Sequence, residues 1–301
     1  HAITAALRQW QDEPHVHVVV IEGAGDRAFC AGGDIRAFRQ HHLEGDHGPI
    51  EAFFTHEYAL NQMIGTYPKP YVALIDGICM GGGIGVSVHA PYRVATEHAM
   101  FAMPETAIGF FPDIGATYFL PRLPGRIGFY LGLTGARVIG ADAVHAGFGT
   151  HFTPRDRIHA LSRALARDGA GALAEFATPL PPFSLASQRE ALDRCFGADM
   201  VLEIIQRLRA EESAWARETL KLLRAVSPSA LCWTLKALQR GEGMTLPQAL
   251  EAELALTRTA MAHPDFAEGV RAMVVDKDRV PKWQPARIEE VDPLVIAAMF
   301  G

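Results

Sequence analysis

The chain lacks the features that define several large classes of protein. It has no CxxC pair and no cysteine–histidine spacing typical of a zinc site, so we expect no metal. No apolar run approaches the roughly 18 residues that a membrane-spanning helix needs. A basic surplus is also missing, because 28 Lys+Arg stand against 34 Asp+Glu, a net charge of −6. We therefore expect neither a membrane protein nor a general nucleic-acid binder.

Motifs for phosphate and dinucleotide binding are missing as well. No Gly-Lys-Ser/Thr follows the glycine cluster at residues 81–83, which excludes a P-loop, and no GxGxxG fingerprint precedes an acid at the required distance. The 4 cysteines are interpreted as buried, reduced thiols, since a chain of this length does not need disulfides. The sequence begins at His1 with no basic-then-apolar leader, which we interpret as a fragment or a processed form without a visible targeting signal.

The composition is that of a folded protein with a sizeable core. Of 301 residues, 49% are hydrophobic and 21% are charged, which suits one large domain or two ordinary ones. In the first half, short apolar runs alternate with glycine-rich turns and candidate helices, the pattern of an α/β unit with crossover connections. We expect strands at 16–21, 71–75, 92–95 and 100–103, the first buried largely on both faces, and helices at 3–11, 50–64, 83–89 and 114–120.

Beyond about residue 155 the strand patterns stop. Helical spacing of apolar residues continues to about residue 262, with Thr245 as a cap and His263-Pro264 as a stop for the longest helix. The proline-rich run at 178–182 is expected to be an extended connector. We therefore predict an α/β region at 1–155 and a helical region at 156–301. The later helices are expected at 157–167, 186–194, 200–209, 213–225, 229–240 and 246–262.

Two glycine motifs can bind an oxyanion. In FCAGGDI (29–35) a double glycine precedes Asp34, and in CMGGGIG (79–85) a triple glycine follows a strand and precedes a short helix. Glycine allows close backbone approach, and N–H groups from two loops can form an oxyanion hole. The alternatives are a plain turn with Asp34 as a helix cap and a tight packing turn at the triple glycine.

Three acids lie among apolar residues. Glu105 and Asp113 are surrounded in sequence by phenylalanine, methionine and isoleucine, which predicts a raised pKa suited to acid–base chemistry. Glu57 lies within the apolar stripe of the helix predicted at 50–64, where an unpartnered carboxylate is costly. The alternatives are a solvated loop for Glu105, a helix cap for Asp113 and a solvated stripe edge for Glu57.

The segment HHLEGDHGP (41–49) places three histidines and two acids close together in sequence. Such a cluster suggests a metal site, but glycine and proline interrupt it and it is polar throughout. We interpret it as a mobile loop.

These motifs, in this order, resemble the crotonase (enoyl-CoA hydratase/isomerase) superfamily over nearly the whole chain. The residues that carry the resemblance are FCAGGDI, CMGGGIG, MPETAIGFFPDIGATYFLPRLPG (103–125) and LTG (133–135). The late segment HPDFAEGVRAMVVDKDRVPKW (263–283) is similar to the 3-hydroxyisobutyryl-CoA hydrolase branch. The resemblance implies a crotonase-like spiral of ββα units with a helical C-terminal region.

The resemblance also implies roles for individual residues. The N–H groups of Gly33 and Gly82 would hold the thioester oxygen, and Glu105 matches the catalytic glutamate of the family. Glu57 and Asp113 match acids that contact the substrate in the hydrolase branch. Ala31–Ile35, which includes Asp34 and Ile35, would line the site of the CoA adenine.

The sequence departs from the family pattern at two points. Hydratases carry a second catalytic glutamate two residues after the triple glycine, where this chain has Gly85. Without that acid, addition of water to a double bond has lost one acid–base group. The first strand of the family and its Asn-Ala-Leu stretch would precede His1, so part of the CoA site is not visible.

The resemblance therefore implies hydrolysis of a short branched or hydroxylated acyl-CoA thioester, foremost 3-hydroxyisobutyryl-CoA, as in valine catabolism. Coenzyme A enters as part of the substrate, and no other cofactor is expected. The alternatives are an enoyl-CoA hydratase or isomerase on the same fold and a catalytically silent CoA-binding protein. A homo-oligomer is compatible with the sequence. The expected compartment is the cytoplasm for a bacterial protein and the mitochondrial matrix for a eukaryotic one.

Overall fold

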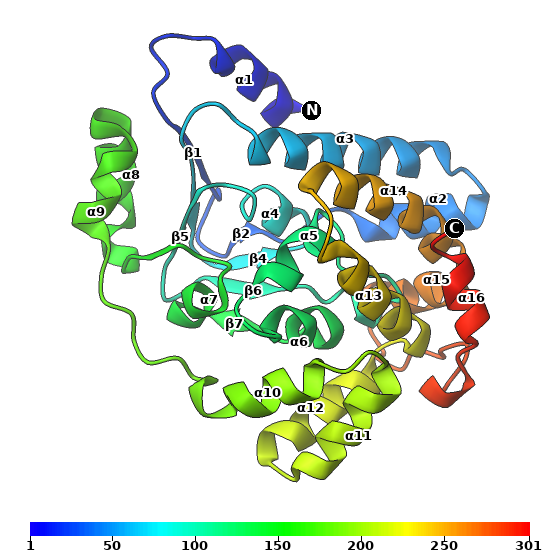
Figure 1. Ribbon diagram of the computed structural model, residues 1–301. Helices are drawn as coiled ribbons and strands as arrows, with labels where there is room; N and C mark the ends of the chain where they lie inside the picture. The colour runs from blue at the N-terminus through cyan, green and yellow to red at the C-terminus, as the bar shows by residue number, and fades with distance from the viewer. The chain divides into compact units, whose positions relative to one another are not determined.

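The computed structural model describes residues 1–301, and contacts divide the chain into two units. The first unit contains all the strands and the second is built from helices, so both draw on segments far apart in sequence (Figure 1). The α/β fold class is confirmed, whereas the boundary at residue 155 stays a prediction. The first unit comprises His1–Gly32, His56–Ala102 and Arg137–Ala186, and the second comprises Gly33–Thr55, Met103–Ala136 and Ser187–Gly301.

One sheet of the first unit is entirely parallel. Its strands are, in spatial order, β1 (Val19–Glu22), β3 (Tyr71–Ile75), β5 (Tyr92–Ala95) and β8 (His151–Phe152). All five residues of β3 are buried, because successive side chains point to opposite faces and helices cover both. Val72 and Leu74 pack against Leu161 of one helical layer, while Tyr71 packs against Leu7 of the other.

The second sheet of this unit orders its strands β2 (Ala28–Cys30), β4 (Ile78–Met80), β6 (Met100–Ala102) and β7 (Val138–Ile139). The first three pair in parallel and β7 is antiparallel to β6. Strands β2 and β4 end within the two glycine motifs, shortly before their glycines, so this sheet sets the position of both turns.

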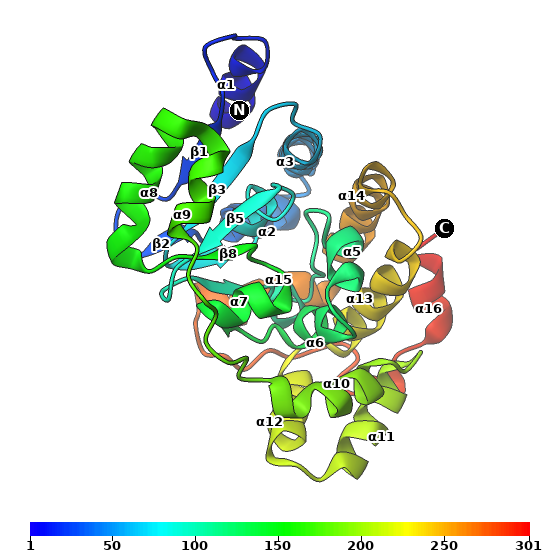
Figure 2. The same cartoon turned by 60° about the vertical axis from the view of Figure 1, so that its left-hand side comes forward.

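The helices of the first unit cover the all-parallel sheet. Helices α8 and α9 lie along one face of it, as Figure 2 shows, and α1 with the end of α3 packs on the other face. The bounds are α1 (Ala2–Gln11), α3 (Gly48–Gly65, shared with the second unit), α4 (Gly82–Gly85), α7 (Ala141–Ala146), α8 (Arg155–Asp168), 3₁₀ helix η3 (Gly169–Ala172) and α9 (Leu173–Phe176).

The second unit is a helical assembly around α6 and α13, whose side chains are largely buried. Helix α13 packs against α5 and α6, and α14 packs against α5 (Figure 1). The bounds are α2 (Ile35–Glu44), η1 (Glu105–Ile108), α5 (Ala116–Phe119), η2 (Leu120–Arg122), α6 (Ile127–Thr134), η4 (Ala186–Gln188), α10 (Arg189–Phe196), α11 (Val201–Glu211), α12 (Ala214–Ala225), α13 (Pro228–Gly241), α14 (Leu246–Ala262), α15 (Pro264–Val270), π-helix η5 (Arg271–Val275), η6 (Ile288–Glu290) and α16 (Pro293–Ala298).

Four sequence-based expectations are wrong. Strand β1 is not buried on both faces, because it is the edge strand and only Val19 is fully buried. The helix expected at 83–89 ends at Gly85, and the helix expected at 114–120 begins only at Ala116, because Ile114 and Gly115 adopt positive φ values. The mobile loop expected at 41–49 is wrong, since His41, His42 and Glu44 belong to α2, which ends at the left-handed Gly45.

Several other expectations are confirmed. Thr245 caps α14 through a reciprocal capping box with Gln248, and the proline-rich segment at 178–182 has no regular structure. All four cysteines are free thiols; Cys79 and Cys195 are buried as expected, whereas Cys30 and Cys232 are only half-buried. None of the helices combines the length and apolar character that a membrane crossing requires.

Candidate active site

The residues that the sequence singles out fall on both units. The structure brings Glu57 against Gly82 within the first unit, and it places Glu105 near Asp113 within the second. The first unit holds Ala31, Glu57 and Gly82, and the second holds Gly33, Asp34, Ile35, Glu105 and Asp113.

Gly82 is the first residue of α4, directly after β4. The first N–H groups of a helix have no acceptor within the helix, so this position offers donors to an anion. A Cβ built on Gly82 would lie 2.6 Å from Oε1 of Glu57, so glycine leaves room for this carboxylate beside the backbone. Glu57 is half-buried on α3, between the buried position expected inside the apolar stripe and the solvated edge that was the alternative.

The packing role of the triple glycine is also real. A Cβ on Gly83 would lie only 2.4 Å from the carbonyl oxygen of Cys30, so this glycine is needed for close contact between α4 and the end of β2. Gly81 takes a φ of 50°, in the region that favours glycine. The three glycines therefore serve different purposes, and only Gly82 combines a helix N-terminus with a neighbouring carboxylate.

The first glycine motif leads directly into α2. Asp34 is the N-cap of this helix, and its Oδ1 accepts hydrogen bonds from the N–H groups of Arg36 (3.1 Å) and Ala37 (3.3 Å). The capping alternative for Asp34 is thus confirmed. Ala31 and Gly33 are exposed and Ile35 is half-buried, so this segment is accessible to a ligand.

Glu105 is the first residue of η1 and is only 8% exposed, which excludes the solvated-loop alternative. Its Oε2 atom is buried and accepts no hydrogen bond, an arrangement that is rare for a carboxylate. Burial raises the pKa of Glu105 well above its ordinary value, and the charge of Asp113 raises it further. The expected raised pKa is confirmed, and its main cause is desolvation.

Hydrogen bonds hold the backbone around Glu105. The carbonyl oxygen of Glu105 accepts a bond from Phe110 N (3.0 Å), and that of Thr106 accepts one from Ser227 N (3.2 Å). A Cβ on Gly109 would lie 2.3 Å from the carbonyl oxygen of Asp265, so α15 packs directly on this turn. The catalytic candidate is therefore held by helices α13 and α15, which come late in the sequence.

Asp113 is buried, and the N-cap position of α5 is occupied by Gly115. The carboxylate that binds this helix start is Glu253 of α14, which the sequence reasoning missed. Burial raises the pKa of Glu253 to about 8, and the charge of Asp113 also raises it, whereas hydrogen bonds from Thr117 and Gly115 lower it. Glu105, Asp113 and Glu253 form the acid cluster.

The sequence around Glu253 carries a signal of its burial. Ala249, Leu250 and Leu256 mark the buried stripe of α14, and Glu253 lies within it. This is the same kind of pattern that singled out Glu57. In both helices, an acid inside the apolar stripe therefore indicates a carboxyl that is at least partly buried. The pattern does not predict which groups bind it.

The comparisons with known proteins establish the family of this chain. The chain belongs to the enoyl-CoA hydratase/isomerase family, whose model matches residues 1–300. It is 44% identical over 306 residues to "3-hydroxyisobutyryl-CoA hydrolase, mitochondrial" of Xenopus tropicalis, covering 98% of this chain and 79% of the relative. The human protein of the same name is 43% identical over 298 residues, covering 95% of this chain and 77% of the relative.

Two solved structures share the fold over the whole chain. One, titled as a carnitinyl-CoA dehydratase from Mycobacterium thermoresistibile, is 41% identical with a TM-score of 0.94, covering 100% of this chain and 87% of that one. The other, titled as an enoyl-CoA hydratase from Rhodobacter sphaeroides 2.4.1, is 42% identical with a TM-score of 0.93, covering 100% and 88%. The crotonase fold is confirmed, and the names attached to it cover more than one reaction.

Proposed function

We propose that this protein hydrolyses a short branched or hydroxylated acyl-CoA thioester, foremost 3-hydroxyisobutyryl-CoA, to the free acid and CoA. The observation that carries the proposal is Glu105, a buried carboxyl with a raised pKa and an unpartnered oxygen, in a chain that has Gly85 where hydratases have their second acid. The names of the 3-hydroxyisobutyryl-CoA hydrolase relatives support the substrate.

In the proposed reaction, Glu105 takes a proton from water as the water attacks the thioester carbonyl. Alternatively, Glu105 attacks the carbonyl itself and forms an anhydride that water then opens. In both routes the C–S bond breaks, and the CoA thiolate leaves and is protonated to the free thiol. Asp113 positions the water or relays the proton, and Glu57 binds the acyl hydroxyl or holds Glu105.

The oxyanion is proposed to form hydrogen bonds with the N–H groups of Gly33 and Gly82. Gly82 N–H lies at the start of α4, where no intrahelical acceptor exists. Gly32, the residue before Gly33 in the chain, lies close to Gly82, because a Cβ on Gly32 would lie 3.6 Å from Gly82 N. Ala31–Ile35 is proposed to contact the adenine of CoA, with Asp34 acting through its cap of α2.

The second candidate function is hydration of an enoyl-CoA or the reverse dehydration. The titles of the two similar solved structures favour it. Gly85 argues against it, because addition of water across a double bond uses two acid–base groups. For the compartment we propose the mitochondrial matrix in a eukaryote, which the relatives' names support, and the cytoplasm in a bacterium.

The test is a pair of assays on the same preparation. The protein is incubated with 3-hydroxyisobutyryl-CoA and with crotonyl-CoA, while free thiol and the enoyl chromophore are followed. The proposal predicts fast thiol release from the first substrate and little loss of chromophore from the second. Fast hydration without thiol release would overturn the hydrolase and support the second candidate. With labelled water, single-turnover transfer of oxygen into Glu105 would identify the anhydride route.

A further inference from the structure

Glu253 is buried to 1% exposure and has no cation beside it. Its Oε2 accepts a hydrogen bond from Gly115 N (2.6 Å), and its Oε1 accepts bonds from Thr117 N (2.9 Å) and Thr117 Oγ1 (2.6 Å). It forms no ion pair with lysine, arginine or histidine. A buried carboxylate is costly without a charged partner. The hydrogen-bond partners of Glu253 are the backbone of one turn and one hydroxyl.

The turn that Glu253 binds is a strained one. Ile114 has a φ of 59° and Gly115 a φ of 81°, so two consecutive residues lie in the left-handed region. For a β-branched residue such as isoleucine this conformation is a genuine outlier, which persists only where the surroundings enforce it. The residue directly before it is Asp113, whose carbonyl oxygen accepts a bond from Ala116 N (2.9 Å).

Glu253 takes the place of the missing cap on α5. Gly115 is the N-cap and has no side chain to accept a bond, so the first N–H groups of the helix need an acceptor from elsewhere. Helix α14 packs against α5 and supplies this acceptor (Figure 1). Asp113 and Glu253 also lie close enough for the charge of Asp113 to act on Glu253.

We propose that Glu253 is a positioning residue for Asp113: by binding the N–H groups of Gly115 and Thr117 and the Thr117 hydroxyl, it fixes the strained turn that carries Asp113 beside Glu105. The inference rests on the proposed hydrolase function, in which Asp113 acts on the attacking water. Glu253 itself touches no reacting atom, and its effect passes through the turn.

Two substitutions separate the hydrogen bonds from the bulk of the side chain. Above a pH of about 8, where Glu253 is ionised, both of its oxygens accept hydrogen bonds. In Glu253→Gln, one amide end still accepts bonds, but its NH₂ group cannot accept from an N–H donor, so either the Gly115 or the Thr117 contact is lost. Thr117→Val removes only the hydroxyl donor and keeps the shape, whereas Thr117→Ser keeps the donor. Glu251→Gln is the matched control, because Glu251 is an exposed acid on the same helix.

The experiment measures thiol release, acyl-CoA binding stoichiometry and Tm for all four variants. Above a pH of about 8, where Glu253 is ionised, we expect kcat per binding site to fall about 10-fold in Glu253→Gln and about 3-fold in Thr117→Val, with KM within about 2-fold of the parent. Thr117→Ser and Glu251→Gln are expected to match the parent. The acidic limb of the pH–rate profile is expected to move to lower pH in Glu253→Gln, because Asp113 no longer raises the pKa of Glu105 as strongly.

A merely structural role would reduce the number of binding sites and Tm while leaving kcat per site and the pH midpoint unchanged, and that result would overturn the inference. If Glu253→Gln does not fold, the Thr117→Val and Thr117→Ser pair decides, and equal kcat in these two would overturn it. Failure of the hydrolase proposal is a separate result: the parent protein would then hydrate crotonyl-CoA without releasing thiol from 3-hydroxyisobutyryl-CoA. The same variants are then compared on hydration.

Discussion

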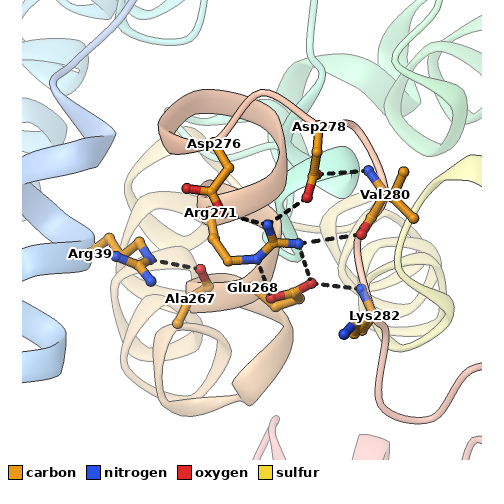
Figure 3. A network of polar contacts seen from close by, with 8 residues as sticks. All are labelled: Arg39, Ala267, Glu268, Arg271, Asp276, Asp278, Val280 and Lys282. Carbon is orange, nitrogen blue, oxygen red and sulfur yellow. Dashed lines mark hydrogen bonds and ion pairs between the residues drawn. The ribbon is translucent and has the colours of Figure 1, made fainter.

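Two regions of the second unit hold their carboxylates in opposite ways. Around Arg271, the guanidinium forms ion pairs with Glu268 (2.8 Å), Asp276 (2.6 Å) and Asp278 (2.7 Å), as Figure 3 shows, and Lys282 N donates to Glu268. In the acid cluster, neither Glu105 nor Glu253 has a cation for a partner. Hydrogen bonds from Arg271 lower the pKa of Glu268 and of Asp278, whereas burial raises the pKa of Glu105 and of Glu253.

The difference separates acids that lower the free energy of the folded state from acids that raise it. The Arg271 region joins α15 to the segment that follows it, and charge pairing there lowers the free energy of the folded state. The acid cluster raises the free energy of the folded state, because each buried carboxyl must lose either its hydration or its charge. Acids retained at such a cost are typical of functional sites, so the contrast supports the proposed role of Glu105.

The largest expected effect is at Glu105. Glu105→Gln keeps the shape and removes the carboxylate, so we expect loss of nearly all turnover with acyl-CoA binding close to that of the parent. Calorimetric Kd and kcat from thiol release measure the two quantities. Glu268→Gln, an acid of the Arg271 region, is the control and should retain turnover. If Glu105→Gln kept most of its turnover, the catalytic role would pass first to Asp113 and then to Glu57.

The next largest effect is at Gly82, which tests the chemistry of the first unit. A side chain at this position must displace the Glu57 carboxylate, and a misplaced N–H no longer binds the oxyanion. Gly82→Val is expected to lower kcat by a factor of ~100 or more, since one such donor is worth about 3–4 kcal/mol. The protein should fold, because the end of Glu57 can move. Gly171→Val, in open space, is the control, and equal kcat in both variants would contradict the assignment.

A smaller effect, on the pH dependence of the free energy of unfolding, also distinguishes the two regions. Because the folded-state pKa of Glu253 is raised to about 8, its folded form binds the extra proton, and the free energy of unfolding should fall as pH rises from about 4.5 to about 8. The parent is expected to lose a few kcal/mol relative to Glu253→Gln over this range. Urea unfolding at a series of pH values measures this difference. A constant difference across the range would contradict the raised pKa.

The smallest effect is expected at Arg271. The lowered pKa values of Glu268 and Asp278 mean that their contribution is present at neutral pH and is lost as pH falls through the folded-state pKa. Arg271→Gln should lower Tm by a few degrees at neutral pH and less in acid or in high salt, because these charges are near the surface. Differential scanning calorimetry measures Tm, and a decrease that grows with added salt would be inconsistent with charge pairing.

Much of the fold could be predicted because the signals are local. The strand at 71–75 is a continuous apolar run because both its faces are covered. Thr245 indicates the start of the helix that it caps. Strands β2 and β4, with three residues each, and β7 and β8, with two residues each, were missed because such short segments carry little periodic pattern; among strands this short, only β6 was expected. The division into two discontinuous units depends on long-range contacts that no local pattern encodes.

The candidate site shows the same limit. Glu105, Asp113 and Glu57 could be singled out because each is an acid among apolar neighbours. Asp34 proved to be a helix cap, and its contact with a ligand stays a prediction. Glu253 binds Thr117 across 136 positions of sequence, so its relation to Asp113 could only come from the structure.

The most direct test of the central claim is the pH dependence of kcat for thiol release from 3-hydroxyisobutyryl-CoA. A base must be deprotonated to act, and burial raises the pKa of Glu105 well above 4.5. The account predicts an acidic limb in which kcat rises with pH around a midpoint clearly above the ordinary glutamate value. A midpoint near 4.5, or a flat profile through this range, would contradict a buried Glu105 as the catalytic group.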